Sequence, residues 1–239
     1  MASKKIATPV AKQRAAKNPA TKRGSAKSAE QKSPLWSRAV KHLKARDEAM
    51  PMVVARHGAP TLPTEPTRDP LQSLGRAIVY QQLSGAAAGT IYGRFVARYP
   101  GKKFPRAPHL LATAHEDLRA VGLSNAKAAA LLDLARHVVE KRVVPSRLHR
   151  MTDDEIMDAL LPVRGIGPWS VHMFLMFALG RPDVLPTGDL GIKKGMQRHF
   201  GLASLPSAEE MEKLAESWRP FRTAGCWYMW RVADSSDEE

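Results

Sequence analysis

The chain has 239 residues, 44% of them hydrophobic, which is ordinary for one compact soluble unit. Its formal net charge of +14 and its pI near 10.2 favour a polyanionic partner, either nucleic acid or an anionic membrane surface. No apolar run approaches the roughly 18 residues of a membrane-spanning helix, and the single cysteine, Cys226, excludes an internal disulfide framework, a four-cysteine zinc site and a four-cysteine iron–sulfur cluster.

Residues 1–33 carry more than half of this charge. They contain nine lysines and arginines and one acid, Glu30, for a net +8, which leaves +6 for the rest of the chain. Because large apolar side chains are scarce, the segment cannot offset the entropy of ordering, and we expect a disordered basic arm. The arm either has a function, which is non-specific attraction of phosphates or nuclear import, or is a solvated, dispensable tail. The solitary cysteine and the lack of a signal-peptide core predict an intracellular location. The basic arm favours the nucleus, with the bacterial cytoplasm or nucleoid as the alternative.

From Pro34 onward the sequence has the capping and breaking residues of short helices. It shows no convincing alternation of apolar and polar residues, which strands would require, so an all-α fold is predicted. Asp69 followed by Pro70 is an N-cap with proline at the first helical position, and its helix should end near residues 81–83. Further caps and breakers predict helices over 84–99, from Ser124 onward, over 152–161, from Ser207 to Pro220 and over 221–232. Without a repeat or a long linker, residues 34–233 should form one two-lobed domain, followed by an acidic disordered tail over 234–239.

The most informative segment is a predicted helix-hairpin-helix over residues 152–180. Gly165-Ile166-Gly167 permits torsions that other residues avoid and a close approach of the backbone to a partner, while its isoleucine plugs between the helices. The free N–H groups that start the next helix, the hydroxyl of Ser170 and the charge of Arg164 make an anion site suited to a DNA phosphate. The alternative is a tight turn between packed helices, and the basic charge of the chain favours DNA.

Such a hairpin anchors a DNA backbone without reading bases, so chemistry must come from elsewhere. About twenty residues later, Asp189 stands at the predicted N-cap of a new helix. An aspartate in this position is most often only a capping residue. The helix N-terminus would also favour the ionised form of the carboxyl, which a catalytic role would require.

The combination of Gly165-Ile166-Gly167-x-Trp169-Ser170 with Leu185-Pro186-x-x-Asp189-Leu190 resembles the helix-hairpin-helix (HhH-GPD) DNA glycosylase superfamily, and within it the 3-methyladenine DNA glycosylase II branch. Residues 80–84 are similar to the DNA-intercalating turn of that family, and residues 218–231 to its terminal helix. The resemblance covers roughly residues 35–232. It implies an all-helical, two-lobed fold with the active site in the cleft between the lobes.

The resemblance also implies roles for individual residues. It places the catalytic carboxylate at Asp189, the DNA wedge at Leu83 and Gln82, and the base pocket at Trp169, Trp230, Tyr80 and Met173. A fixed carboxylate would stabilise the oxocarbenium-like charge on the sugar, and an apolar wedge would offset the cost of flipping a base. Electron-rich indoles would bind an alkylated, cationic purine by cation–π attraction, although core packing is the alternative for both tryptophans. Some relatives have an aromatic residue where this chain has Met173, so its pocket should be wider or softer.

Contacts to the DNA backbone are expected from the hairpin and from two lysines. The candidates are Arg164, Gly165, Gly167, Ser170, Lys127 and Lys193. For Lys127, which follows a turn at residues 122–125, a solvated side chain is an equal alternative. No cofactor and no divalent metal is expected. The resemblance implies at most a structural monovalent cation at the carbonyls of Leu161, Val163 and Ile166.

The reaction type follows from one position. Relatives that also cleave the strand carry a Schiff-base lysine where this chain has Trp169, so the resemblance implies a monofunctional enzyme. The leading hypothesis is hydrolytic excision of 3-methyladenine and 7-methylguanine from double-stranded DNA, leaving an abasic site, by a monomer that binds no membrane. The alternatives are a non-catalytic DNA-binding protein, which the basic arm and hairpin alone would support, and a glycosylase/lyase acting on oxidised bases.

Overall fold

The computed structural model describes residues 33–235, which form helices and connecting loops without a β-strand. The predicted all-α fold is confirmed. The elements are α1 (Pro34–Arg46), α2 (Met50–His57), α3 (Pro70–Tyr80), α4 (Gly85–Ala97), η1 (Pro100–Lys102), α5 (Ala107–Leu111), α6 (His115–Ala120), α7 (Asn125–Val139), η2 (Pro145–Arg150), α8 (Asp153–Leu160), α9 (Pro168–Phe177), α10 (Leu190–His199), α11 (Ala208–Leu214), η3 (Glu216–Trp218) and α12 (Arg222–Asp234). None of these helices is both long and apolar enough to span a bilayer.

The ends of the chain fall largely outside this description. The predicted basic arm lies outside the described residues except for Ser33, and the predicted acidic tail lies outside them except for Asp234 and Ser235. Asp234 is the last residue of α12, so the helical part of the chain extends one residue beyond the predicted domain end.

The capping signals act as the sequence predicts. Asp69, Ser84 and Ser124 each accept a hydrogen bond from the backbone N–H three residues later, at the starts of α3, α4 and α7. Both predicted capping boxes, before α8 and α11, are complete. One predicted end is wrong, because α11 stops at Leu214 and a separate 3-10 turn, η3, follows before Pro220. The tighter turn carries the buried indole of Trp218, whose N–H group donates to Asp47 at 2.8 Å.

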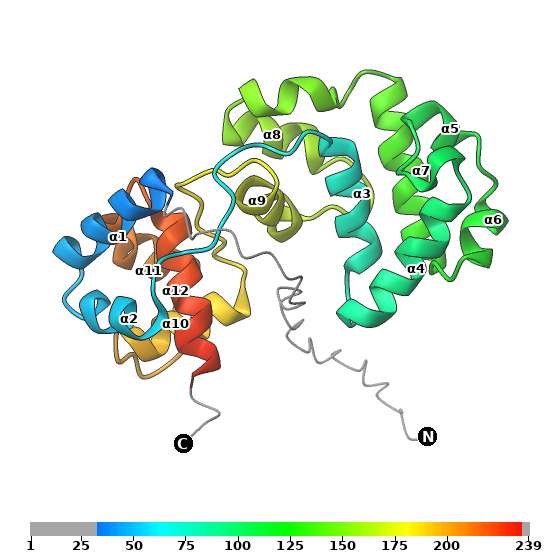
Figure 1. The fold of residues 1–239 in the computed structure, drawn as a ribbon. Helices are drawn as coiled ribbons and strands as arrows, with labels where there is room; N and C mark the ends of the chain where they lie inside the picture. The colour runs from blue at the N-terminus through cyan, green and yellow to red at the C-terminus, as the bar shows by residue number, and fades with distance from the viewer. Residues whose placement is uncertain (1–32, 236–239) are drawn as a thin grey trace, which may run out of the picture.

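The helices gather in two groups with α9 between them (Figure 1). In one group α10 packs along α12, and the N-terminal helices α1 and α2 pack against α12 as well. In the other, α3 packs on α4 and α7, and α5 and α6 pack on α7. The N-terminal and C-terminal segments therefore share one group, which nothing in the sequence indicates.

Two glycines allow close packing of α12, one against α10 and the other against Trp218 of η3. A Cβ atom on Gly195 of α10 would lie 2.0 Å from the carbonyl oxygen of Met229 on α12. A Cβ on Gly225 of α12 would lie 2.4 Å from the ring of Trp218. A larger residue at 195 would push α10 and α12 apart, and one at 225 would push α12 away from Trp218. The close contact at Gly195 decides which side chains of α12 reach the N-terminus of α10, where Asp189 lies.

A buried aspartate ties the first group together. Asp47, after α1, accepts hydrogen bonds from the indole of Trp218 and the backbone N–H of Met50, and the imidazole Nε2 of His199 lies 2.8 Å from its carboxylate. Burial opposes ionisation of Asp47, but the hydrogen bonds from His199 and Trp218 outweigh it and hold the pKa of the carboxyl below its ordinary value of 3.8. The charged carboxylate thus links the α1–α2 turn, α10 and η3.

This pKa shift predicts how acid acts on the fold. A carboxyl whose pKa is lower in the folded than in the unfolded state stabilises the fold above about pH 3.8, and that stabilisation is lost as the pH falls through the folded-state value. Asp47→Asn should therefore lower the unfolding free energy at neutral pH by roughly 1 to 3 kcal/mol and lose less on further acidification. Urea unfolding over a series of pH values measures both effects, with the exposed cap variant Asp69→Asn as the control. Parallel acid curves for wild type and Asp47→Asn would contradict the assignment.

Candidate active site

Asp189 lies at the N-terminus of α10 with its carboxylate surrounded by N–H donors. Oδ1 accepts from the backbone N–H of Ile192 at 2.9 Å and from the indole N–H of Trp230 at 2.9 Å, while Oδ2 accepts from the indole N–H of Trp169 at 2.6 Å. Only 9% of the residue is exposed. Because all three partners donate, the arrangement suits the ionised carboxylate, which can only accept. Asp189 is thus a capping residue and also the centre of an indole-lined cluster.

The aromatic surface beside this carboxylate comes from one face of α9 together with α12. Trp169, Met173 and Phe177 are spaced by four residues and so line one face of α9. Trp169 and Phe177 are 42% and 40% exposed, and Phe177 stacks on Trp230 with ring centroids 5.9 Å apart at 23°. Neither Trp169 nor Phe177 is a core residue, and together with Trp230 they offer flat apolar faces next to a negative charge.

Phe177 was not among the predicted site residues. The signal that would have found it is its helical register with Trp169 and Met173, combined with the unusual exposure that only the structure reveals. Gly191 was missed as well. A Cβ there would lie 2.9 Å from the ring of Trp230 and 3.2 Å from Oδ1 of Asp189, so glycine lets the indole reach the carboxylate.

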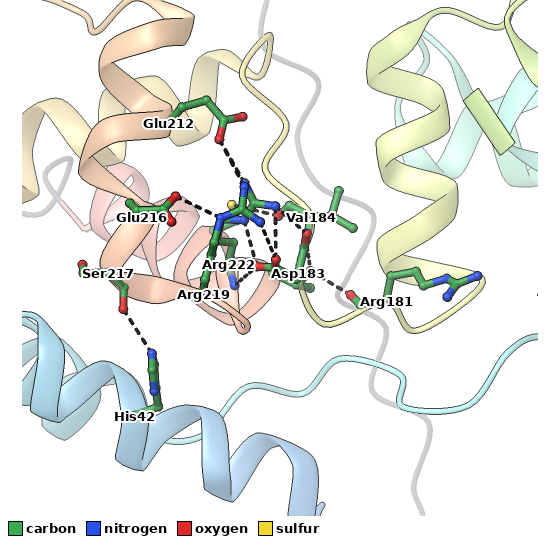
Figure 2. A network of polar contacts seen from close by, with 11 residues as sticks. His42, Arg181, Asp183, Val184, Glu212, Glu216, Ser217, Arg219 and Arg222 are labelled. Atoms are coloured by element: carbon green, nitrogen blue, oxygen red, sulfur yellow. Dashed lines mark hydrogen bonds and ion pairs between the residues drawn. The ribbon is translucent and has the colours of Figure 1, made fainter. Parts of the chain in front are cut away.

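The segment that leads to Asp189 is fastened to the start of α12 (Figure 2). The guanidinium of Arg222 donates to both carboxylate oxygens and to the backbone carbonyl of Asp183, at 2.8 to 3.2 Å, and to Glu212 at 3.0 Å. Beside it, the hydroxyl of Thr223 accepts from the Val184 N–H at 3.0 Å and donates to the Arg181 carbonyl at 2.7 Å. Residues 181–184 are therefore held on the same helix that supplies Trp230.

The hairpin before α9 has one packed glycine and one open glycine. Gly165 has φ of 78°, and a Cβ there would lie 3.0 Å from the Cβ of Ala130 on α7. Gly167, the N-cap of α9, has φ of −105°, and a Cβ there would meet nothing within 4 Å. Ile166 is 6% exposed, so it plugs the interior as predicted. The fold itself thus requires glycine at 165 but leaves the space at 167 open.

The predicted wedge turn lies against this hairpin. Gln82 is exposed with φ of 55°, and Leu83 is half-buried. The side-chain amide of Gln81 donates to the carbonyl of Gly165 at 2.9 Å and to the hydroxyl of Ser170 at 3.3 Å. Gln81 therefore joins the turn to the hairpin and to Ser170, and the residue before Ser170 is Trp169, whose indole donates to Asp189.

A model of the HhH-GPD superfamily of base excision DNA repair proteins matches residues 76–220. The chain belongs to this superfamily. The match includes the wedge turn, the hairpin and Asp189, whereas Trp230 lies beyond it and reaches the site through the packing of α12 on α10.

Similar HhH-GPD proteins occur in a fission yeast and in bacteria. The alkylbase DNA glycosidase-like protein mag2 of Schizosaccharomyces pombe is 32% identical over 199 residues, covering 82% of this chain and 93% of the relative. The solved structure of the 3-methyladenine DNA glycosylase Mag1 from the same yeast, in complex with abasic DNA, has a TM-score of 0.74 at 30% identity and covers 84% of this chain and 99% of that one. A DNA-3-methyladenine glycosidase structure from Bacillus halodurans has a TM-score of 0.74 at 33% identity, covering 87% and 93%.

Three other predicted site residues of this HhH-GPD chain are Tyr80, Lys193 and Lys127. The ring of Tyr80 is covered by the guanidinium of Arg76 at 4.2 Å and meets the edge of Tyr92, so its described contacts are on the α3–α4 side. Lys193 is half-buried on α10. Lys127 directs its ammonium at the backbone carbonyl of Val79, near the end of α3, and at that of Gln81 in the wedge turn.

The carbonyl groups of the hairpin are chemically suited to hold the predicted monovalent cation. Carbonyl oxygens are the hard ligands that such an ion takes, and each carbonyl has two lone pairs. The Val163 carbonyl accepts one hydrogen bond, from the Ile166 N–H at 3.1 Å, and so keeps a lone pair for an ion. Arg164, which follows Val163, is exposed, and its backbone N–H donates to the carboxylate of Asp133 on α7 at 2.9 Å.

Proposed function

We propose that this protein is a monofunctional DNA glycosylase that excises alkylated purines from double-stranded DNA by hydrolysis and leaves an abasic site. The observation that carries the proposal is the carboxylate of Asp189 held between the indole N–H groups of Trp169 and Trp230. The relatives named as alkylbase or 3-methyladenine DNA glycosylases support the substrate class.

In this proposal the chain supplies charge, orientation and stacking surface. As the glycosidic bond breaks, positive charge develops on the sugar, and the fixed negative charge of Asp189 stabilises it. The three N–H donors hold the carboxylate in place, so little reorganisation is needed when the charge appears. The faces of Trp169, Trp230 and Phe177 would bind a cationic alkylated base, whose charge also makes it a better leaving group. Met173 would form a softer part of the same wall.

The remaining residues would grip the DNA. The hairpin N–H groups around Gly167, with Ser170 and Arg164, would bind a phosphate at the helix N-terminus. Leu83, presented by the exposed turn at Gln82, would fill the space left in the duplex by the flipped nucleotide. A monovalent cation at the carbonyls of residues 161, 163 and 166 would stiffen the hairpin, and Lys193 would contact backbone.

The finer assignments rest on composition and resemblance. We place the enzyme in the 3-methyladenine DNA glycosylase II branch, acting on 3-methyladenine and 7-methylguanine as a monomer. Residues 34–233 would form the catalytic domain, and the basic residues 1–33 would strengthen non-specific binding to DNA. That basic segment favours a nuclear setting over a bacterial cytoplasm, and relatives occur in both a yeast and bacteria.

The hairpin glycines give a testable contrast. Gly167→Ala should change the unfolding free energy by less than about 0.5 kcal/mol, because its Cβ meets only open space. The same methyl group should keep a phosphate off the N–H groups and weaken duplex binding about ten-fold. Gly165→Ala, at positive φ, should instead cost about 1 to 2 kcal/mol of stability. Thermal unfolding and fluorescence anisotropy with duplex DNA measure the two effects, and unchanged affinity in Gly167→Ala would exclude close approach of a phosphate there.

The activity itself is tested with the full-length protein and duplex DNA treated with a methylating agent. We expect release of 3-methyladenine and 7-methylguanine and the appearance of alkali-labile abasic sites, with untreated duplex as the control. A protein that binds the duplex but yields no abasic sites would be a DNA-binding module instead. Borohydride reduction should trap no covalent protein–DNA adduct, and a trapped adduct would indicate a lyase.

A further inference from the structure

The C-terminus of α3, where the wedge turn begins, is completed by a side chain from another helix. The last four carbonyls of a helix lack partners within it. The ammonium of Lys127, on α7, donates to the carbonyl of Val79 at 2.8 Å and to that of Gln81 at 2.6 Å. A cation at this end also lies at the negative pole of the helix dipole. Lys127 thus satisfies two carbonyls that flank the start of the turn.

The position of this ammonium differs from that of a lysine that binds DNA from solution. Lys127 is half-buried, and burial lowers the pKa of its ammonium. An ammonium has three N–H donors, and two of them are directed at backbone carbonyls of the same protein. The ammonium is therefore already hydrogen-bonded at the start of the wedge turn in the protein without DNA.

The wedge turn is also held from its other side. The side-chain amide of Gln81 reaches the hairpin, at the carbonyl of Gly165 and the hydroxyl of Ser170. The next residue, Gln82, has φ of 55°, a left-handed conformation that is uncommon without glycine and needs support from its surroundings. Lys127 holds the turn through its carbonyls, and Gln81 fixes it to the phosphate-binding hairpin.

We infer that Lys127 is a positioning residue for base flipping, which acts by fixing the Gln81–Leu83 turn against the hairpin, and not a contact to the DNA backbone. The inference rests on the proposed function, because it assigns how the wedge of that enzyme is held. With the turn fixed, Leu83 enters the duplex at a set distance from the phosphate held by the hairpin. Without Lys127 the wedge loosens, the flipped state is less populated, and the chemistry at Asp189 is unaltered once a base is flipped.

The test compares Lys127→Met, which keeps the aliphatic stem, with Lys127→Arg, which can still donate to both carbonyls, and with Lys41→Met, which removes one exposed charge from α1. Flipping is followed by the fluorescence of 2-aminopurine placed next to the lesion, base release by single-turnover kinetics, and binding by the salt dependence of the dissociation constant. We expect Lys127→Met to lower the flipping equilibrium and the release rate together, by about ten-fold, the loss of a hydrogen bond to a charged group. Its salt slope should equal that of Lys41→Met, and Lys127→Arg should restore most of the flipping.

A second variant keeps the test independent of any folding defect. Gln81→Met cuts the link to the hairpin without changing charge and should show the same joint loss of flipping and release. Backbone amides of residues 81–84 should exchange hydrogen faster in both variants. Normal flipping with a reduced salt slope in Lys127→Met would identify a phosphate contact and overturn the inference. If the wild-type protein flips a methylated base without releasing it, the proposed hydrolysis fails while the flipping measurements still decide the role of Lys127.

Discussion

Asp189→Asn should lower the single-turnover rate of base release by at least about 10³-fold while duplex DNA still binds within a few-fold of wild type. The substitution removes the charge that would stabilise the sugar cation. It also replaces one carboxylate oxygen by an NH₂ group, which must then face an indole or backbone N–H where all three present partners are donors. Release of 3-methyladenine from methylated duplex measures the rate, and anisotropy measures binding.

The chain contains a matched control for this experiment. Asp69 is also an aspartate at a helix N-cap, accepting from the Gln72 N–H at 2.9 Å, but it is exposed and has no indole partner. Asp69→Asn should leave the rate unchanged, since asparagine caps helices about as well as aspartate. Full activity in Asp189→Asn would remove this carboxylate from the mechanism and leave only a DNA-binding role for the site.

Arg222→Met should destabilise the protein by about 3 kcal/mol and lower the rate of base release as well. The guanidinium is almost buried and holds the carboxylate and the backbone carbonyl of Asp183 (Figure 2). Its loss leaves Asp183 with the more exposed Arg219 as its cationic partner and loosens residues 181–184. That segment leads directly to Asp189, whose carboxylate is held between two indole N–H groups by hydrogen bonds of 2.6 and 2.9 Å. A small shift of the segment would lengthen these bonds and misplace the carboxylate. Urea unfolding and single-turnover release measure the two effects.

The neighbouring Arg219 provides the comparison. It also pairs with Asp183, at 3.0 Å, but its side chain is 44% exposed, so Arg219→Met should cost less than about 1 kcal/mol and leave the rate near wild type. Equal losses of stability and rate in the two variants would mean that positive charge near Asp183 matters and that the buried contacts of Arg222 have no special role. If Arg222→Met loses stability but keeps the wild-type rate at a temperature where it is folded, the Arg222–Asp183 contacts do not position Asp189.

The local features of this protein could be predicted because each depends on residues close together in the chain. A cap such as Asp69, a capping box such as the one at Thr152, and the Gly165-Ile166-Gly167 hairpin are decided by backbone groups within about one helical turn. The all-α fold, the hairpin and the location of Asp189 at a helix start therefore followed from the sequence. The end of α11 did not, because the indole of Trp218 bonds to Asp47, 171 residues away.

Local sequence signals predicted an all-α fold, several capped helices, the hairpin and a carboxylate at an N-cap, and the family resemblance assigned that carboxylate its proposed role. Packing between helices directs the indole N–H groups of Trp169 and Trp230 at Asp189, and no local signal predicts this. The same packing stacks Phe177 on Trp230 and turns Lys127 toward the carbonyls of Val79 and Gln81. These contacts join residues 20 to 53 positions apart. They arise from the close packing of α10 on α12 and of α7 on α3, and packing between distant helices leaves no periodic trace in the chain.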